Sequence, residues 1–128
     1  MTPSLGAASA IAATFPALEL LVLHGSRARG DAHEASDWDF AFQAGPDFDP
    51  DALLARLAEA LHANHIDLAD LDRASALLRH KAAGDGVVVF ERTPEVFKRF
   101  QIEAITAWSD MEAVLRAEYE SMLARLPR

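Results

Sequence analysis

Residues 25–30, Gly-Ser-Arg-Ala-Arg-Gly, and residues 36–39, Ser-Asp-Trp-Asp, decide the interpretation of this chain. The first stretch follows the aliphatic run 18–23, which is typical of a buried strand entering a tight turn. In the second stretch, the alternation of side chains along a strand places Asp37 and Asp39 on the same face. The sequence therefore predicts a strand, a glycine turn and a short helix, followed by a strand that begins with paired carboxylates.

The two stretches carry complementary chemistry. Like charges at positions i and i+2 of a strand are unfavourable unless a divalent cation lies near them. A glycine turn lets the backbone approach a phosphate closely, a hydroxyl and helix N–H groups add donors, and arginines supply forks for phosphate oxygens. We therefore predict a nucleotide-binding set and a metal-binding pair. The set consists of Gly25, Ser26, Arg27 and Arg29, and the pair consists of Asp37 and Asp39.

Length and composition restrict the class of protein. The chain has 128 residues, 51% of them hydrophobic and 25% charged, which fits a single globular domain over residues 1–128 and excludes a disordered chain. Its 12 basic and 20 acidic residues give a net charge of −8, which disfavours a nucleic-acid partner and suits a basic protein partner. Because the chain has no cysteine, a disulfide, a thiolate zinc site and a cysteine nucleophile are excluded.

The most apolar stretch, residues 5–23, differs from a membrane span and from a signal peptide. Pro16 and Glu19 interrupt it, and the first basic residue of the chain, Arg27, comes only after it. We therefore expect a cytoplasmic protein that does not enter a membrane.

Hydrophobic periodicity predicts strands that alternate with helices. The predicted strands cover residues 18–23, 37–42, 66–71 and 87–90, and the predicted helices cover residues 4–15, 50–63, 74–81 and 94–126. Asp49 and Pro50 mark one helix start, and Thr93 and Pro94 mark the last. This pattern places the chain in the α/β (α+β) class, with a sheet of about four strands covered by helices, and leaves the strand directions open.

The final predicted helix carries an apolar stripe with spacings of three and four residues. The stripe consists of Phe97, Phe100, Ala104, Trp108, Met111, Leu115, Tyr119, Met122 and Leu126. Periodicity does not show what the stripe packs against, which could be the chain's own sheet, a second copy of the chain, or another protein.

A glycine-serine pair, ten residues and an Asp-x-Asp pair resemble the signature of the DNA polymerase beta type nucleotidyltransferase superfamily. The run Gly-Ser-Arg-Ala-Arg-Gly followed by Ser-Asp-x-Asp resembles its small branch, the minimal nucleotidyltransferases. Residues 66–71, residues 86–91 and the long final helix resemble the antitoxin subgroup MntA. The resemblance implies the nucleotidyltransferase fold with a mixed sheet, two Mg²⁺ ions, and transfer of AMP from ATP to a tyrosine of a HEPN-domain ribonuclease toxin, HepT.

The resemblance also implies a third catalytic carboxylate on a neighbouring strand, and Asp67 and Asp70 compete for this role. Three residues apart on a strand, they point to opposite faces, so only one joins the site. We favour Asp67, which follows an isoleucine at the strand start, as a metal ligand and as the group that accepts or orients the proton of the attacking hydroxyl. The chain departs from the family pattern at Trp38, where an aliphatic residue is usual, and at His24. For His24 the alternatives are a contact with the nucleotide or simply the end of the strand, and we favour the strand end.

Two other functions stay open. A nucleotidyltransferase for a small molecule such as an aminoglycoside uses the same chemistry, but it needs additional chain to form an acceptor pocket. A non-catalytic antitoxin that inhibits by contact alone does not need the full set of carboxylates. His62 and His65 have the spacing of a zinc pair, but no third ligand follows at a matching spacing, so we interpret them as exposed residues near a helix end.

Overall fold

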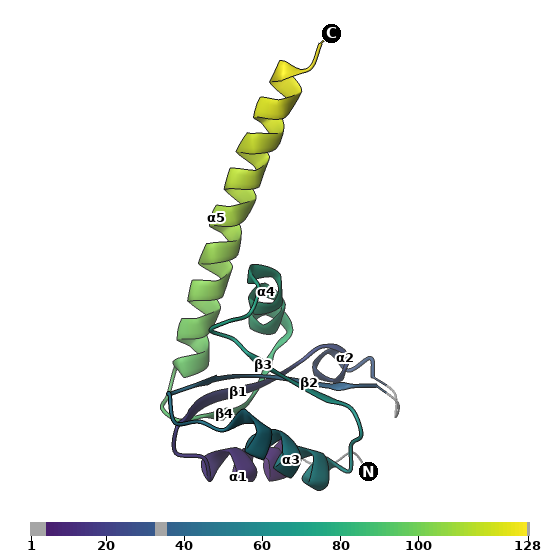
Figure 1. Cartoon of the computed structure of the whole chain (residues 1–128), viewed down its shortest axis with the longest axis vertical. Coiled ribbons are helices and arrows are strands. Elements are labelled where there is room, and N and C mark those ends of the chain that lie inside the picture. Colours follow the sequence, from purple (N-terminus) through teal and green to yellow (C-terminus); the bar gives the residue numbers. More distant parts are fainter. Residues whose placement is uncertain (1–4, 33–35, 128) are drawn as a thin grey trace.

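The computed structural model describes residues 5–32 and 36–127, in which four strands form one sheet with helices on both faces (Figure 1). The strands are β1 (Leu18–His24), β2 (Trp38–Ala44), β3 (Ile66–Asp70) and β4 (Val87–Glu91). The helices are α1 (Leu5–Ala13), α2 (Ser26–Arg29), α3 (Pro50–Leu61), α4 (Ala76–Asp85) and α5 (Val96–Arg125). Each predicted strand and helix is present, with its ends within four residues of the prediction.

The sheet is mixed, as the family resemblance implied. Its strand order is β3-β2-β1-β4, with β1 antiparallel to β2 and to β4, and β2 parallel to β3. This arrangement brings the carboxyl end of β1 to the same edge of the sheet as the amino ends of the other three strands. The glycine turn after β1 therefore lies beside the paired carboxylates of β2.

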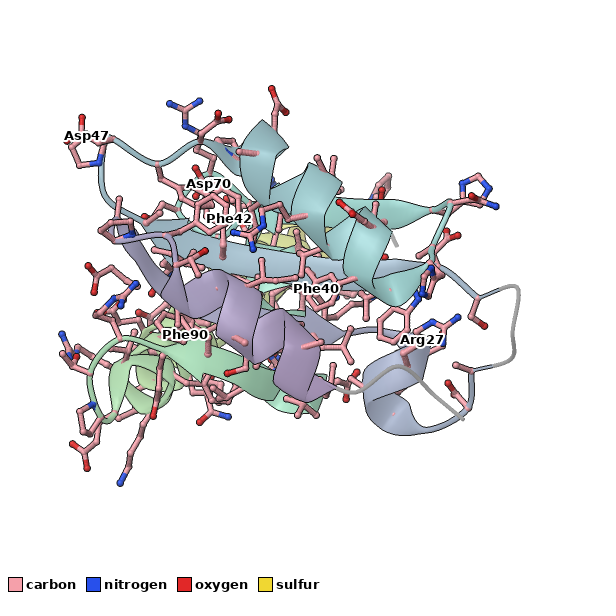
Figure 2. All side chains as sticks on the ribbon, turned by 90° about the horizontal axis from the view of Figure 1, so that it is seen from below. Arg27, Phe40, Phe42, Asp47, Asp70 and Phe90 are labelled. Carbon is pink, nitrogen blue, oxygen red and sulfur yellow. The ribbon has the colours of Figure 1, made fainter. Side chains whose placement is uncertain are left out.

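Two hydrophobic layers hold the helices on the sheet. On one face, α1 and α3 pack through side chains such as Leu57 against Leu21 and Phe40. Figure 2 looks onto this face and shows the two helices crossing the sheet, with Phe40 between them and the strands. On the other face, Ala83 of α4 and Phe100 of α5 belong to a second buried cluster. Because β2 alternates, Trp38 and Phe40 face the first layer, and the residue between them, Asp39, points to the side of α4.

Two helices, α3 and α4, start after capping side chains, whereas α5 starts at Val96, two residues later than predicted from Thr93 and Pro94, after a Glu95 that makes no side-chain cap. The Asp49 side chain accepts hydrogen bonds from the backbone N–H groups of Asp51 and Ala52 at 3.1 and 3.3 Å, with proline at the first helical position of α3. The Ser75 hydroxyl oxygen caps α4 in the same way, accepting from the Leu78 N–H at 3.1 Å. Within the described ranges, no helix has the length and apolarity needed to cross a membrane.

The long helix α5 is packed at its base and extends away from the sheet beyond it (Figure 1). Phe100 and Ala104 are buried, and the Gln101 side chain donates to the Ala83 carbonyl of α4 at 2.8 Å. Further along, Leu115 and Tyr119 are 55% and 62% exposed. The predicted stripe is thus buried at Phe100 and Ala104, half-buried at Trp108, which stacks on His80 of α4, and exposed from Leu115 onward.

Candidate active site

The site begins with the turn between β1 and α2. Gly25 has a φ of 75°, in the left-handed region that favours glycine, and its carbonyl accepts from the N–H groups of Ala28 and Arg29 at 3.1 Å each. The helix ends after one turn at Gly30, which has a φ of 84° and donates its N–H to the Ser26 carbonyl. These bonds fix the shape of the turn, which directly follows β1 and therefore lies at the end of the sheet where β2 and β3 begin.

Gly25 lies directly against the Asp39 side chain. A Cβ atom added at Gly25 would meet the Asp39 Oδ2 atom at 2.5 Å and the Asp39 Cγ atom at 3.3 Å. Only glycine therefore allows the backbone of the turn to come this close to the carboxylate. The predicted nucleotide-binding turn and the predicted metal-binding strand form one continuous surface.

The strand register places a second carboxylate beside Asp39. Asp39 and Asp67 are paired residues of the parallel strands β2 and β3, so their side chains lie on the same face. Burial raises the pKa of Asp39 above its usual value, the carboxylates of Asp67 and Asp37 raise it further, and His24 opposes them. A side-chain hydrogen bond with Asp67 has the same raising effect. Such crowding of carboxylates is relieved by a bound proton or by a cation.

Asp37 lies at the rim of this site. It precedes β2 and its side chain is exposed, yet it is close enough to raise the pKa of Asp39. In the described part of the chain, no three histidine or acidic side chains form a group that could hold a metal ion by themselves. The three predicted carboxylates are therefore a close pair with an outer member, rather than a closed cage of ligands.

Asp70, the competing carboxylate, lies elsewhere. It pairs with Phe42 in the register, and Figure 2 shows it near Phe42, at the end of the sheet away from Arg27. Its carboxylate accepts from the Asp72 backbone N–H at 2.9 Å and lies 3.8 Å from the Arg73 side chain. Asp70 has the local role of a strand-end cap, whereas Asp67 lies beside Asp39.

The two arginines of α2 hold contacts within the chain. Arg29 forms exposed ion pairs with Asp31 at 3.4 Å and with Asp85 of α4 at 3.6 Å. Arg27 donates to the Ser36 carbonyl oxygen and lies over the Trp38 ring. The sequence predicts that both bind phosphate, and in the structure both make contacts with residues of the chain itself.

His24 lies in the site, although the sequence favours its interpretation as a strand end over a contact with the nucleotide. It pairs with Asp39 across the antiparallel strands, and Asp39, Asp67 and Asp85 all act electrostatically on it. Burial lowers the pKa of His24, and the three carboxylates oppose that shift. Its position one residue before the glycine turn was the available signal, but it became informative only once the pairing of β1 with β2 was known.

The remaining candidates take no part in the carboxylate cluster. His62 and His65 are exposed near the end of α3, as the sequence indicated, and His65 directly precedes β3, where its carbonyl oxygen accepts from the Trp38 N–H. Surface hollows of about 350 and 320 Å³ lie around Gly45, where β1 begins and β2 ends. They are at the opposite end of the sheet from the carboxylates and are open, so the glycine turn and the carboxylates define the candidate site.

A family model matches more than half of the chain. Residues 8–95 match the model for polymerase beta nucleotidyltransferases. The match includes all four strands and the turn, and it ends just before α5 begins.

Two relatives are similar over most of the chain. Protein adenylyltransferase MntA of Aphanizomenon flos-aquae is 29% identical over 120 residues, which cover 84% of this chain and 79% of that protein. Protein adenylyltransferase MntA of Shewanella oneidensis is 30% identical over 112 residues, which cover 85% of this chain and 79% of that protein.

Solved structures share the fold. A chain in a crystal structure of a toxin–antitoxin with AMP-PNP aligns with a TM-score of 0.68 at 29% identity, covering 84% of this chain and 88% of that chain. A chain in the complex of the tri-AMPylated Shewanella oneidensis HEPN toxin with its MNT antitoxin aligns with a TM-score of 0.62 at 26% identity. That alignment covers 87% of each chain.

Proposed function

This chain belongs to the polymerase beta nucleotidyltransferase family and to the family of protein adenylyltransferase MntA, and we propose that it is an antitoxin that AMPylates its toxin. It transfers AMP from ATP to a tyrosine of a cognate HEPN-domain ribonuclease, a HepT-like toxin, and thereby silences it. The observation that carries this proposal is the Gly25 turn packed against Asp39, with Asp67 beside it. Because both substrates are cytoplasmic, we place the activity in the cytoplasm.

Mg²⁺ fits the donor set at the carboxylates. Asp39 and Asp67 place two carboxylates on the same face of the sheet, and Asp37 lies at the rim of the site. Mg²⁺ is usually held by one or two carboxylates together with substrate phosphates and water, so a closed set of protein ligands is not required. We propose that these three carboxylates hold two Mg²⁺ ions together with ATP. When bound, the ions neutralise charge on the triphosphate.

The groups of the chain bind and orient the two substrates. Backbone N–H groups of the turn and the Ser26 hydroxyl bind the β and γ phosphates, and Arg29 offsets the charge on departing pyrophosphate. The tyrosine oxygen attacks the α-phosphorus in line, forming a new P–O bond while the bond to pyrophosphate breaks. The proton of the tyrosine hydroxyl goes to the Asp67 carboxylate.

The uncovered part of α5 provides a surface for the toxin. Leu115, Tyr119 and Met122 lie at helical spacing and are each more than half exposed. Such a stripe is a typical binding surface for a partner helix or groove. The occupant that we propose is the HEPN toxin, because similar chains are solved in toxin–antitoxin complexes. A ribonuclease must also present basic surface to hold RNA, which complements the net charge of −8.

The position of the label in ATP tests the reaction. With the purified chain, its toxin and Mg²⁺, label from [α-³²P]ATP should appear on the toxin, whereas label from [γ-³²P]ATP should not. Removal of divalent ions with EDTA should reduce the labelling to background, and added Mg²⁺ should restore it. Transfer of the γ label would show a kinase, and no transfer from either nucleotide would favour inhibition by contact alone.

The Gly25→Ala substitution should damage the site more than its backbone strain alone explains. At the φ of 75° and ψ of −158° of Gly25, a region essentially restricted to glycine, an alanine costs about 1–3 kcal/mol of folding free energy. At Gly25 the new methyl group would also displace the Asp39 carboxylate, and a misplacement of about 1 Å can lower a rate about 100-fold. We expect a similar loss of AMP transfer, measured as initial rate.

Gly30→Ala is the matched control for this substitution. Gly30 also has a positive φ, but a Cβ there would have no neighbour within 4 Å. Gly25→Ala should lose more thermal stability than Gly30→Ala, because the φ of 75° and ψ of −158° at Gly25 are essentially restricted to glycine, whereas the φ of 84° and ψ of 10° at Gly30 are left-handed helical values that other residues can adopt. At a temperature at which both variants are folded, only Gly25→Ala should lose most of its transfer rate. Equal loss of rate in both would show that the contact between Gly25 and Asp39 does not matter for transfer.

A further inference from the structure

The Arg27 side chain connects the glycine turn to the start of the carboxylate strand. Its Nε and Nη2 atoms donate hydrogen bonds to the Ser36 carbonyl oxygen at 3.2 and 2.9 Å. Its guanidinium carbon lies 4.1 Å from the centroid of the Trp38 ring. Ser36 directly precedes Asp37, so these contacts fix the backbone on both sides of the first of the paired carboxylates.

The platform under Arg27 is part of the hydrophobic core. Trp38 is only 6% exposed and stacks with Phe40, with ring centroids 6.0 Å apart and ring planes within 4°. Its backbone N–H also donates to the His65 carbonyl oxygen at 3.1 Å, next to the start of β3. Figure 2, viewed from the side of α1 and α3, shows Arg27 at this end of the sheet.

Arg27 lies on the face of β2 opposite to the carboxylate site. Trp38 and Asp39 are successive strand residues and therefore point to opposite faces. A guanidinium seated on the Trp38 ring is thus on the side away from the carboxylate pair. A lysine cannot reproduce this arrangement, because it lacks the flat fork that donates twice and stacks at the same time.

We infer that Arg27 is a positioning residue, which holds the segment of Asp37 and Asp39 against the glycine turn, in place of the phosphate contact that its sequence position suggests. This inference rests on the proposed AMP transfer, since the positioned groups are those that bind ATP. Trp38, the departure from the family pattern, then has a function: it provides the surface on which Arg27 is seated.

A double-mutant cycle in kcat tests the inference. Arg27→Lys and Trp38→Leu should each lower kcat for AMP transfer about 10- to 100-fold, because both loosen the same segment, with KM for ATP changed by less than about threefold. The double variant should be no slower than the slower single variant, because the two substitutions remove one contact. Trp38→Tyr, which keeps an aromatic surface, should recover most of kcat.

The matched control combines Arg29→Lys with Trp38→Leu. Arg29 also lies in α2, but its ion pairs are with Asp31 and Asp85 rather than with Trp38. The fold-reductions in kcat from Arg29→Lys and from Trp38→Leu should therefore multiply in this double variant. If Arg27 instead binds a phosphate of ATP, Arg27→Lys should keep most of kcat and raise KM for ATP. Its effect on kcat/KM should then multiply with the effect of Trp38→Leu. Any of these outcomes overturns the inference.

Backbone hydrogen exchange without ATP gives a readout independent of transfer. In Arg27→Lys, the Trp38 amide should exchange at least about tenfold faster, while the buried Leu57 amide, which reports on the overall fold, should be unchanged. An unchanged Trp38 amide contradicts the inference even if kcat falls. If the unmodified chain transfers no AMP at all, the proposed function fails, and the exchange measurement still decides whether Arg27 holds the segment.

Discussion

Asp67→Ala should abolish AMP transfer, lowering the rate by at least about 1,000-fold, while Asp70→Ala on the same strand should leave it nearly unchanged. Asp67 lies beside Asp39, and in the proposed reaction it holds metal with ATP and accepts the proton of the tyrosine, so its loss would remove two contributions. Initial rates of toxin labelling measure the effect. Asp37→Ala and Asp39→Ala should be similarly inactive.

The pair of variants also separates a chemical effect from a structural one. Asp67 is exposed and lies among other carboxylates, so Asp67→Ala should not lower the melting temperature and should relieve repulsion of Asp39. Asp70→Ala loses a cap on the Asp72 N–H and should be slightly destabilised. If Asp70→Ala is the inactive variant and Asp67→Ala is active, the assignment of the third carboxylate is wrong.

Two charges placed on the exposed stripe of α5 should prevent the toxin complex from forming. In the Leu115→Glu/Met122→Glu variant, desolvated contacts in the centre of the proposed interface would be replaced by charges, which we expect to weaken toxin binding at least about 100-fold. Because both side chains are already more than half exposed, the fold and the binding of AMP-PNP with Mg²⁺ should be retained. Titration calorimetry with toxin and with AMP-PNP measures the two effects separately.

The control for this variant carries the same charges on the other face of the helix. Ala117 and Ala124 are also exposed but lie about half a turn away from the stripe. Ala117→Glu/Ala124→Glu should therefore bind toxin almost as well as the unmodified chain. Equal weakening in both variants would point to net charge alone, and no weakening in either would exclude the stripe as the toxin surface.

Local patterns predicted most of the fold. The alternation and aliphatic runs identified all four strands, and Asp49 with Pro50 marked the start of α3 at the correct residue. These signals depend on neighbours in sequence, which is why they can be read without tertiary structure. The strand directions were left open by the pattern, because the pairing of β1 with β2 and β4 joins segments that are far apart in the chain.

The candidate site, too, could be predicted only in part from local sequence patterns. The period of a strand was enough to show that Asp67 and Asp70 face opposite ways, but only the register placed Asp67 opposite Asp39. The position of His24 in the site follows from the same cross-strand pairing. The contacts of Arg27 with Ser36 and Trp38 join α2 to the start of β2, and neither composition nor periodicity gives an indication of them.

The stripe of α5 shows a third limit of local pattern. Its spacing is uniform from Phe97 to Leu126, yet only its base is buried. Helical periodicity reports that a face is apolar and does not report what covers it. Only the structure shows which part of the stripe is covered, because α5 extends beyond α4 and away from the sheet (Figure 1).

The most direct test of protein AMPylation is the intact mass of the co-expressed HEPN toxin after incubation with this chain, ATP and Mg²⁺, beside the Asp37→Ala/Asp39→Ala variant. With the unmodified chain, the toxin should gain one or more whole AMP units and lose ribonuclease activity in proportion. With the variant, its mass should not change. A toxin that is bound and silenced without any gain in mass, or that gains the same mass with the variant, would contradict the proposed transfer at this site.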